Sequence, residues 1–146
     1  MNLEDWRVCF MSLPAAVEEI PFGPEFLVYK VAGKIFGILA WQDEPMRINL
    51  KCEPNRALSL RDTYPAVTAG YHMNKTHWNT ILLDGTIDDA TIKAWVVDSY
   101  DLIFNALPKR VQAQMTAQNG FVQQFLQNGK RCSLNICAYN PSLIGG

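Results

Sequence analysis

The chain of 146 residues has 49% hydrophobic residues and a formal net charge of -1. A chain of this size can bury one hydrophobic core, so we expect a single folded unit that needs neither disulfides nor a structural metal. The near-neutral charge is unlike the basic character of most nucleic-acid-binding domains. The N-terminus carries acids where a secretory signal carries bases, and no apolar run approaches the roughly 20 residues that cross a bilayer. These features predict a cytoplasmic protein with no membrane partner.

The N-terminal segment has the pattern of an amphipathic helix. Apolar residues recur at spacings of three and four from Leu3 to Leu13, and Asn2 is a favourable cap. Pro14 is expected to end this helix. The stretch 20–25 then holds two prolines and a glycine, which deny the backbone the hydrogen bonds of a helix or an inner strand. It is therefore expected to be a turn or an extended connection.

Three strands are expected next. The runs 26–31 and 35–41 are rich in β-branched and aromatic residues and flank a glycine turn, which predicts a hairpin. The run 47–52 alternates strictly between apolar and polar residues. It should therefore have one buried face and one solvent face, and the solvent face would carry Arg47 and Lys51.

The sequence pattern after residue 53 predicts two helices and a strand. Pro54 suits the first turn of a short helix that runs to about Asp62. A strand is expected over 77–83, where the composition is strand-like and a turn dipeptide follows. Thr86 is expected to cap the longest helix, which has a broad apolar face and reaches about Leu107 before a proline ends it.

The order of these elements is helix, three strands, helix, strand and long helix. Such segregated strands and helices predict an α+β fold rather than a repeating βαβ unit. The folded domain is expected to span 1–115. Residues 116–146 are polar at first and then offer one strand-like run, 132–137. We expect a C-terminal extension there that either adds an edge strand or is disordered.

The reactive side chains give little sign of a metal site or of catalysis. The four cysteines form no C-x-x-C pair, so reduced and mostly buried thiols are expected. These cysteines are Cys9, Cys52, Cys132 and Cys137. No nucleophile elbow, glycine-rich phosphate loop or H-E-x-x-H motif is present. We expect no cofactor, no bound metal and no enzymatic activity.

Three segments of the chain together resemble the MmcQ/YjbR family. They are the run 21–25 with the strand-like run 28–36, the run Asn49-Leu50-Lys51-Cys52-Glu53-Pro54, and the run Gly70-Tyr71-His72-Met73-Asn74-Lys75-Thr76-His77-Trp78-Asn79-Thr80. The last is the most specific, because general fold constraints do not produce so long a mixture of polar and aromatic residues. The resemblance covers residues 1–113, with the order and spacing of the segments intact. It implies a fold similar to that of the bacterial frataxin homologue, with an antiparallel sheet and helices packed on one face, and it implies DNA binding through a double-wing arrangement.

The charge distribution allows a DNA-binding surface in the middle of the chain. Bases outnumber acids over 30–83, whereas acids outnumber bases over 1–29 and 84–115. The lysine and arginine side chains would contact phosphates. The polar and aromatic residues of the third segment would contact the nucleobases or stack on them. The expected nucleic-acid-binding residues are Lys30, Lys34, Arg47, Lys51, Arg56, Arg61, Tyr71, His72, Asn74, Lys75, His77, Trp78 and Asn79.

Two other interpretations of the Gly70–Thr80 segment stay open. The segment could be the recognition surface of an adaptor that binds a protein or a small ligand. It could also simply lock the sheet to a helix, with Trp78 in the core and the histidines bonded to backbone groups.

Overall fold

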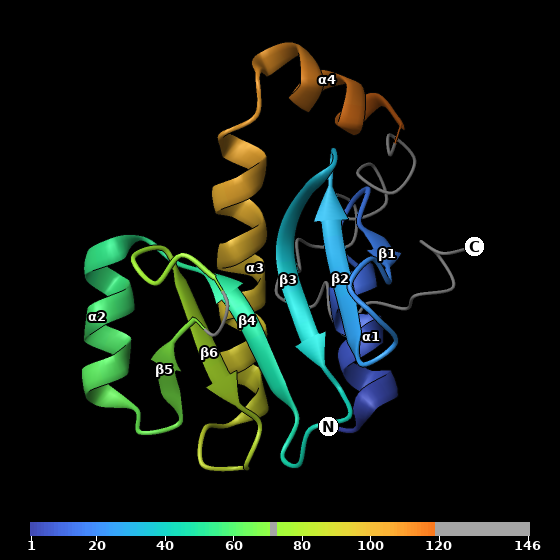
Figure 1. The fold of residues 1–146 in the computed structure, drawn as a ribbon. Helices are drawn as coiled ribbons and strands as arrows, with labels where there is room; N and C mark the ends of the chain where they lie inside the picture. Colours follow the sequence, from blue (N-terminus) through green and yellow to red (C-terminus); the bar gives the residue numbers. More distant parts are fainter. Residues whose placement is uncertain (71–72, 119–146) are drawn as a thin grey trace.

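Six antiparallel strands form a single sheet in the computed structural model of the protein, which describes residues 1–70 and 73–118 (Figure 1). The strand order is β1-β2-β3-β4-β6-β5. The elements follow the chain as α1 (Leu3–Met11), β1 (Val17–Glu19), β2 (Phe26–Val31), β3 (Lys34–Ala40), β4 (Arg47–Lys51), α2 (Pro54–Thr63), β5 (Val67–Ala69), β6 (Trp78–Leu82), α3 (Asp89–Asn105) and α4 (Lys109–Gln118). The strand-like run 132–137 lies outside the described residues. No helix among the described residues is long and apolar enough to cross a membrane.

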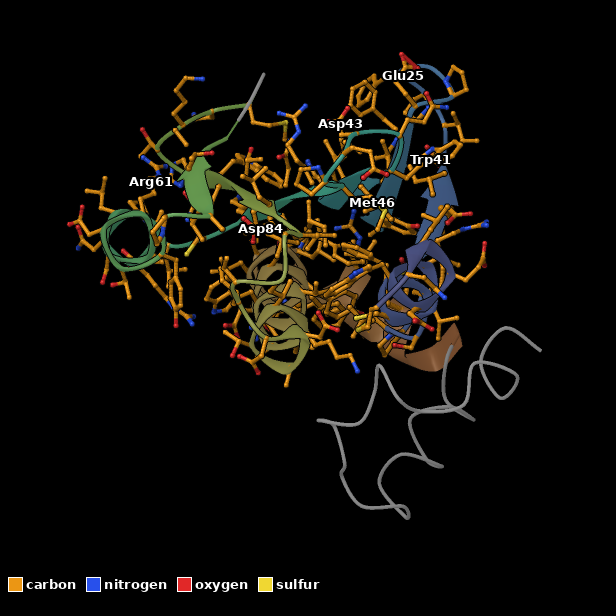
Figure 2. The ribbon with its side chains drawn as sticks, turned by 90° about the horizontal axis from the view of Figure 1, so that it is seen from below. Glu25, Trp41, Asp43, Met46, Arg61 and Asp84 are labelled. Carbon is orange, nitrogen blue, oxygen red and sulfur yellow. The ribbon has the colours of Figure 1, made fainter. Side chains whose placement is uncertain are left out.

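Helices α1 and α3 cover one face of the sheet (Figure 1, Figure 2). Contacts from α3 reach β2, β3 and β4, while α2 lies beside β5 and β6 at one end of the strand order. The opposite face carries no helix in the part of the chain that the structure describes, and we call it the open face. This arrangement confirms the α+β class with an antiparallel sheet, whereas the closer likeness to frataxin stays a prediction.

The core lies between the sheet and helices α1 and α3. Trp6 and Phe10 lie one turn apart on α1 and are buried, and Phe10 stacks on Tyr29 of β2 with ring centroids 4.3 Å apart. Phe36 of β3 meets Tyr100 of α3 edge-on at 5.2 Å. Burial of a large apolar side chain contributes about 1.5–3 kcal/mol. This aromatic cluster therefore fixes both helices against the sheet.

The hairpin, the third strand and the first two helices agree with the sequence predictions. β2 and β3 form the expected hairpin, and β4 shows the alternating burial that its pattern requires. Asn2 caps α1 by a reciprocal pair of hydrogen bonds with Asp5, whose backbone N–H donates to Asn2 Oδ1 at 2.9 Å. Pro54 occupies the first turn of α2. Local patterns and caps are therefore sufficient to determine these elements.

The predicted capping role of Thr86 is wrong. Helix α3 begins at Asp89, with Asp88 at the N-cap. Thr86 belongs to the preceding turn, where its hydroxyl and its backbone N–H both donate to Asp84 Oδ1, at 2.6 and 3.0 Å. Because this turn already occupies the Thr86 side chain, the helix starts further along the chain.

Sequence patterns miss the two edge strands and the last helix. β1 and β5 have three residues each, which is too few for a recognisable alternation. β1 is held by tertiary contacts, since Arg7 of α1 donates to both carboxylate oxygens of Glu18 and the Tyr29 hydroxyl donates to Glu18 Oε2 at 2.6 Å. The Arg7 guanidinium holds the pKa of the Glu18 carboxyl below its usual range. Pro108 ends α3 as expected, but its carbonyl also accepts from Val111 and so opens α4.

Candidate binding site on the open face of the sheet

Residues of four neighbouring strands alternate between the core and the open face. On the open face, cross-strand pairing aligns them in two rows, Val28, Ile38, Asn49 and Thr80 in the first and Phe26, Ala40, Arg47 and Leu82 in the second. In both rows the residues of β2 and β3 are apolar and the residue of β4 is polar. The open face therefore has an apolar half over β2 and β3, bordered by a polar strip along β4.

A pocket of about 290 Å³ lies over the apolar half, and we call it the open-face pocket. Strands β2, β3 and β4 supply most of its lining, and two loops complete it through Phe22 and Met73. Its volume is at the lower end of the range for small-molecule pockets, about 300–1,000 Å³. The lining residues are Phe22, Phe26, Ile35, Ile38, Ala40, Arg47, Asn49 and Met73.

Arg47 and Asn49 form the polar side of this pocket, and neighbouring side chains hold both in place. Arg47 pairs with Asp43 through two nitrogens, with Nη2 and Nε at 2.5 and 2.7 Å from Oδ2. The Thr80 hydroxyl donates to Asn49 Oδ1 at 2.6 Å. Asp43 lies on the side of the sheet away from α1 and α3 (Figure 2). A ligand would therefore meet an apolar pocket with fixed polar groups along one side.

The three segments that carry the family resemblance meet at the open-face pocket. Phe22 and Ile35 come from the first segment, Asn49 from the second and Met73 from the third. They come together because β3 lies between β2 and β4 in the sheet, and because the loops before β2 and before β6 both reach the open face. The pocket is thus a common feature of segments that are far apart in the sequence.

Several of the bases predicted to contact phosphates are engaged within the fold. Lys30 pairs with Glu19 at 2.8 Å on the open face. Arg56 pairs with Asp98 at 2.8 Å between α2 and α3, on the opposite side of the molecule. With Arg47 also paired, these bases do not form one exposed basic surface.

Arg61 and Asn79 together join α2 to the segment before and within β6. Arg61 Nε donates to Asn79 Oδ1 at 2.6 Å, and Asn79 Nδ2 donates to the Ala57 carbonyl at 3.3 Å. Arg61 Nη2 donates to the carbonyls of Lys75 and Trp78. Asn79 is only 2% exposed. Both side chains are therefore committed to internal hydrogen bonds between α2 and β6, and Arg61 lies on the part of α2 that faces the sheet (Figure 2).

The loop before β6 is shaped by its own polar side chains. Asn74 Oδ1 accepts from the backbone N–H of Thr76 at 2.9 Å, and Lys75 Nζ donates to the Gly70 carbonyl at 3.1 Å. These bonds form a compact turn that leads into the strand. The predicted residues Tyr71 and His72 lie outside the described residues.

Three of the predicted lysines make no ion pair with the described residues, namely Lys34, Lys51 and Lys75. Lys34 begins β3 at the hairpin turn, on the exposed surface. Lys51 is the cross-strand partner of Trp78, which is half-buried like the adjacent His77. Lys51 therefore lies opposite the first residue of β6, and Lys75 lies three residues before that strand begins.

No group of three or more His, Cys, Asp or Glu side chains in the described part of the chain could hold a metal ion. Cys9 is buried and Cys52 is half-buried. Burial raises the pKa of the Cys52 thiol. A thiol with a raised pKa stays protonated at neutral pH and is a poor nucleophile. Cys132 and Cys137 lie beyond the described residues.

The fold and the site define a small α+β protein whose antiparallel sheet has one helix-covered face and one open face with a pocket. The chain belongs to the YjbR family, whose sequence profile it matches over residues 11–102. It is 39% identical over 95 residues to the uncharacterised protein YbdF of Escherichia coli O157:H7, and the aligned region covers 65% of this chain and 78% of the relative. It is 30% identical over 109 residues to the uncharacterised protein YjbR of Escherichia coli strain K12, which covers 75% of this chain and 92% of the relative.

Two crystal structures show the same fold. A DUF419-domain protein of Deinococcus radiodurans superposes with a TM-score of 0.75 at 31% identity, covering 78% of this chain and 87% of the other. A protein of Pseudomonas syringae superposes with a TM-score of 0.61 at 26% identity, covering 70% of this chain and 98% of the other. The similarity therefore extends over most of the described residues.

Sequence reasoning did not single out the apolar residues of the open-face pocket. Phe22 gave one usable signal in the sequence, because it is an aromatic residue in a segment with two prolines and a glycine. In the structure its side chain is 58% exposed. Met73 lies within the segment that was singled out, but it is not among the residues expected to bind. Ile38 and Ala40 resemble ordinary strand residues in sequence, so only the fold identifies them as pocket residues.

Proposed function

We propose that the protein is a non-enzymatic binding protein that holds an aromatic or branched aliphatic group of its ligand in the open-face pocket. The observation that supports this proposal is the pocket itself, which has mainly apolar walls and lies on the face that no described helix covers. Removing such a group from water contributes about 1.5–3 kcal/mol. Arg47 and Asn49, already fixed by Asp43 and Thr80, would orient the polar part of the ligand.

Replacing Ala40 by leucine is expected to weaken binding of an apolar probe about tenfold, which corresponds to about 1.4 kcal/mol. Ala40 lines the pocket and is only 7% exposed, so the larger side chain would occupy space that the ligand needs. The probe is Nile red, a neutral dye whose fluorescence rises in apolar surroundings. The measurement is a fluorescence titration of the purified protein.

The matched control is Ala90→Leu, which makes the same substitution at an exposed position on α3. Ala90→Leu should bind the dye as the unmodified protein does. The proposal fails if the dye does not bind saturably, or if Ala40→Leu and Ala90→Leu behave alike. Circular dichroism of both variants establishes that the fold is retained.

A second candidate function, DNA binding, is favoured by the position of Lys51 and Lys75. Lys51 is the cross-strand partner of the half-buried Trp78, Lys75 lies in the loop that leads into β6, and neither has an ion-pair partner in the described part of the chain. Proteins that bind nucleic acids commonly combine lysines that contact phosphates with aromatic rings on which nucleobases stack. Lys34 is a further exposed base on the same sheet.

The double variant Lys51→Ala/Lys75→Ala is expected to flatten the salt dependence of duplex DNA binding. Each lost phosphate contact should reduce the slope of log K against log salt by about 0.9, because fewer counterions are released. Fluorescence anisotropy of labelled duplex DNA at several salt concentrations measures this slope. The control removes the same amount of charge on α4, as Lys109→Ala/Arg110→Ala. Equal slopes for the two double variants would exclude Lys51 and Lys75 from the contact set.

A further inference from the structure

A second cavity lies between α2 and α3, on the helix-covered side of the sheet, and we call it the α2–α3 groove. Its volume is about 280 Å³. The strands contribute core-facing residues to its floor, and each helix contributes apolar side chains to its walls. The apolar lining consists of Leu50, Leu60, Val67, Ile81, Trp95 and Leu102.

The groove also carries charged groups, and one of its carboxylates has no bonding partner in the part of the chain that the structure describes. Arg56 Nη1 pairs with Asp98 Oδ2 at 2.8 Å and so spans the two helices. Glu53 Oε1 accepts from the backbone N–H of Arg56 at 3.1 Å as the cap of α2. Asp101 has neither an ion pair nor a hydrogen-bond partner among the described residues. Burial against the groove, together with the nearby Asp98, raises the pKa of the Asp101 carboxyl.

The spacing along α3 explains why these groups share one groove. Asp98, Asp101 and Asn105 are three and four residues apart, so they lie on one face of the helix. Leu102 belongs to the same face and is 37% exposed. This stripe therefore places the Asp101 carboxylate, the Asn105 amide and an apolar surface side by side.

We propose that the α2–α3 groove binds a small molecule that carries a primary ammonium group on an apolar body. The ammonium would pair with Asp101, and the body would pack against Trp95 and Leu102. Carboxylates outnumber basic side chains in the lining. The carboxylates are Glu53, Asp98 and Asp101, and the basic side chains are Lys51 and Arg56. An ammonium group beside an ionised carboxylate is favourable, because it adds a charge-assisted hydrogen bond.

The size of the groove favours a small molecule over a protein segment. A cavity of about 280 Å³ is near the lower limit for small-molecule sites, and its floor is formed by side chains that are already packed, such as Leu50 and Ile81. This site lies on the other side of the sheet from the open-face pocket. The inference is therefore independent of the proposed function.

The test compares 2-phenylethylamine with its neutral analogue 2-phenylethanol, using the full chain labelled with ¹⁵N. The Trp95 indole N–H signal reports on the groove and is assigned by its loss in Trp95→Phe. We expect the amine to shift this signal with a dissociation constant about tenfold lower than that of the alcohol, because a hydrogen bond to a charged group is stronger than one to a neutral group. In Asp101→Asn the amine should lose this advantage.

The matched control is Asp62→Asn, the same substitution at an exposed position of α2 outside the groove. It should keep the preference for the amine. The inference is overturned if the two probes bind equally to the unmodified protein, if neither shifts the Trp95 signal at millimolar concentration, or if Asp101→Asn keeps the preference. A lysine-containing peptide that shifts the signal where the amine does not would assign the groove to a protein partner instead.

Discussion

Replacing Gly37 by alanine is expected to lower the free energy of unfolding by about 3 kcal/mol, the upper part of the usual range for an overfilled core. A Cβ atom at this position would overlap the ring of Phe10, with Phe10 Cε1 as the nearest atom. The ring has little room to move, because it is fully buried, stacks on Tyr29 at 4.3 Å and meets Phe36 at 6.0 Å. Urea unfolding followed by circular dichroism measures the loss. In an ordinary strand interior the same change would stabilise the protein by about 0.5–1 kcal/mol, so the sign of the effect is informative.

A double-mutant cycle with Phe10→Leu identifies the cause of this effect. Phe10→Leu alone destabilises the protein, since it leaves a cavity beside Tyr29. In the Phe10→Leu background, however, Gly37→Ala should cost much less than in the unmodified chain, because the overlapping ring atoms are gone. If Gly37→Ala costs the same in both backgrounds, the ring of Phe10 is not what requires glycine in β3.

The sequence determines those parts of the fold that depend on neighbouring residues. The alternation of 47–52 is sufficient to predict β4 and its two faces, and Asn2 with Asp5 marks the start of α1. Tertiary contacts decide the elements that were missed. β1 has only three residues and is stabilised by the bonds of Glu18 to α1 and β2, which no local pattern encodes.

The candidate site was less predictable than the fold, because charge alone does not show which groups pair. The sequence shows a surplus of bases over 30–83, but Arg56 finds its partner Asp98 on another helix and Lys30 finds Glu19 on another strand. An apolar pocket is equally hard to predict from the sequence, because its lining residues come from distant segments. Phe22 and Met73 meet at the open-face pocket only because of the strand order, and strand order is not readable from either segment alone.

Replacing Arg61 by alanine is expected to lower the free energy of unfolding by about 2 kcal/mol, even though arginine side chains on helices are usually surface groups. The substitution would leave the Oδ1 atom of Asn79 without its 2.6 Å donor at a position that is 2% exposed. It would also remove one donor from the Trp78 carbonyl, which accepts from Arg61 Nη2 at 3.3 Å and from the Gly70 backbone N–H at 2.8 Å. Urea unfolding measures the stability, and amide hydrogen exchange should show faster exchange at the start of β6.

Arg56→Ala is the matched control, because Arg56 lies on the same helix and has an exposed ion pair with Asp98. An exposed pair of this kind contributes about 0.2–1 kcal/mol, so the control should be clearly milder. Equal stability losses would mean that the bonds of Arg61 to Asn79 do not hold α2 against β6.

The same pair of variants separates two roles of Arg61 in DNA binding. If Arg61 contacts phosphate directly, Arg61→Ala weakens binding while the stability and the exchange rates stay unchanged; if it positions the segment before β6, affinity and stability fall together.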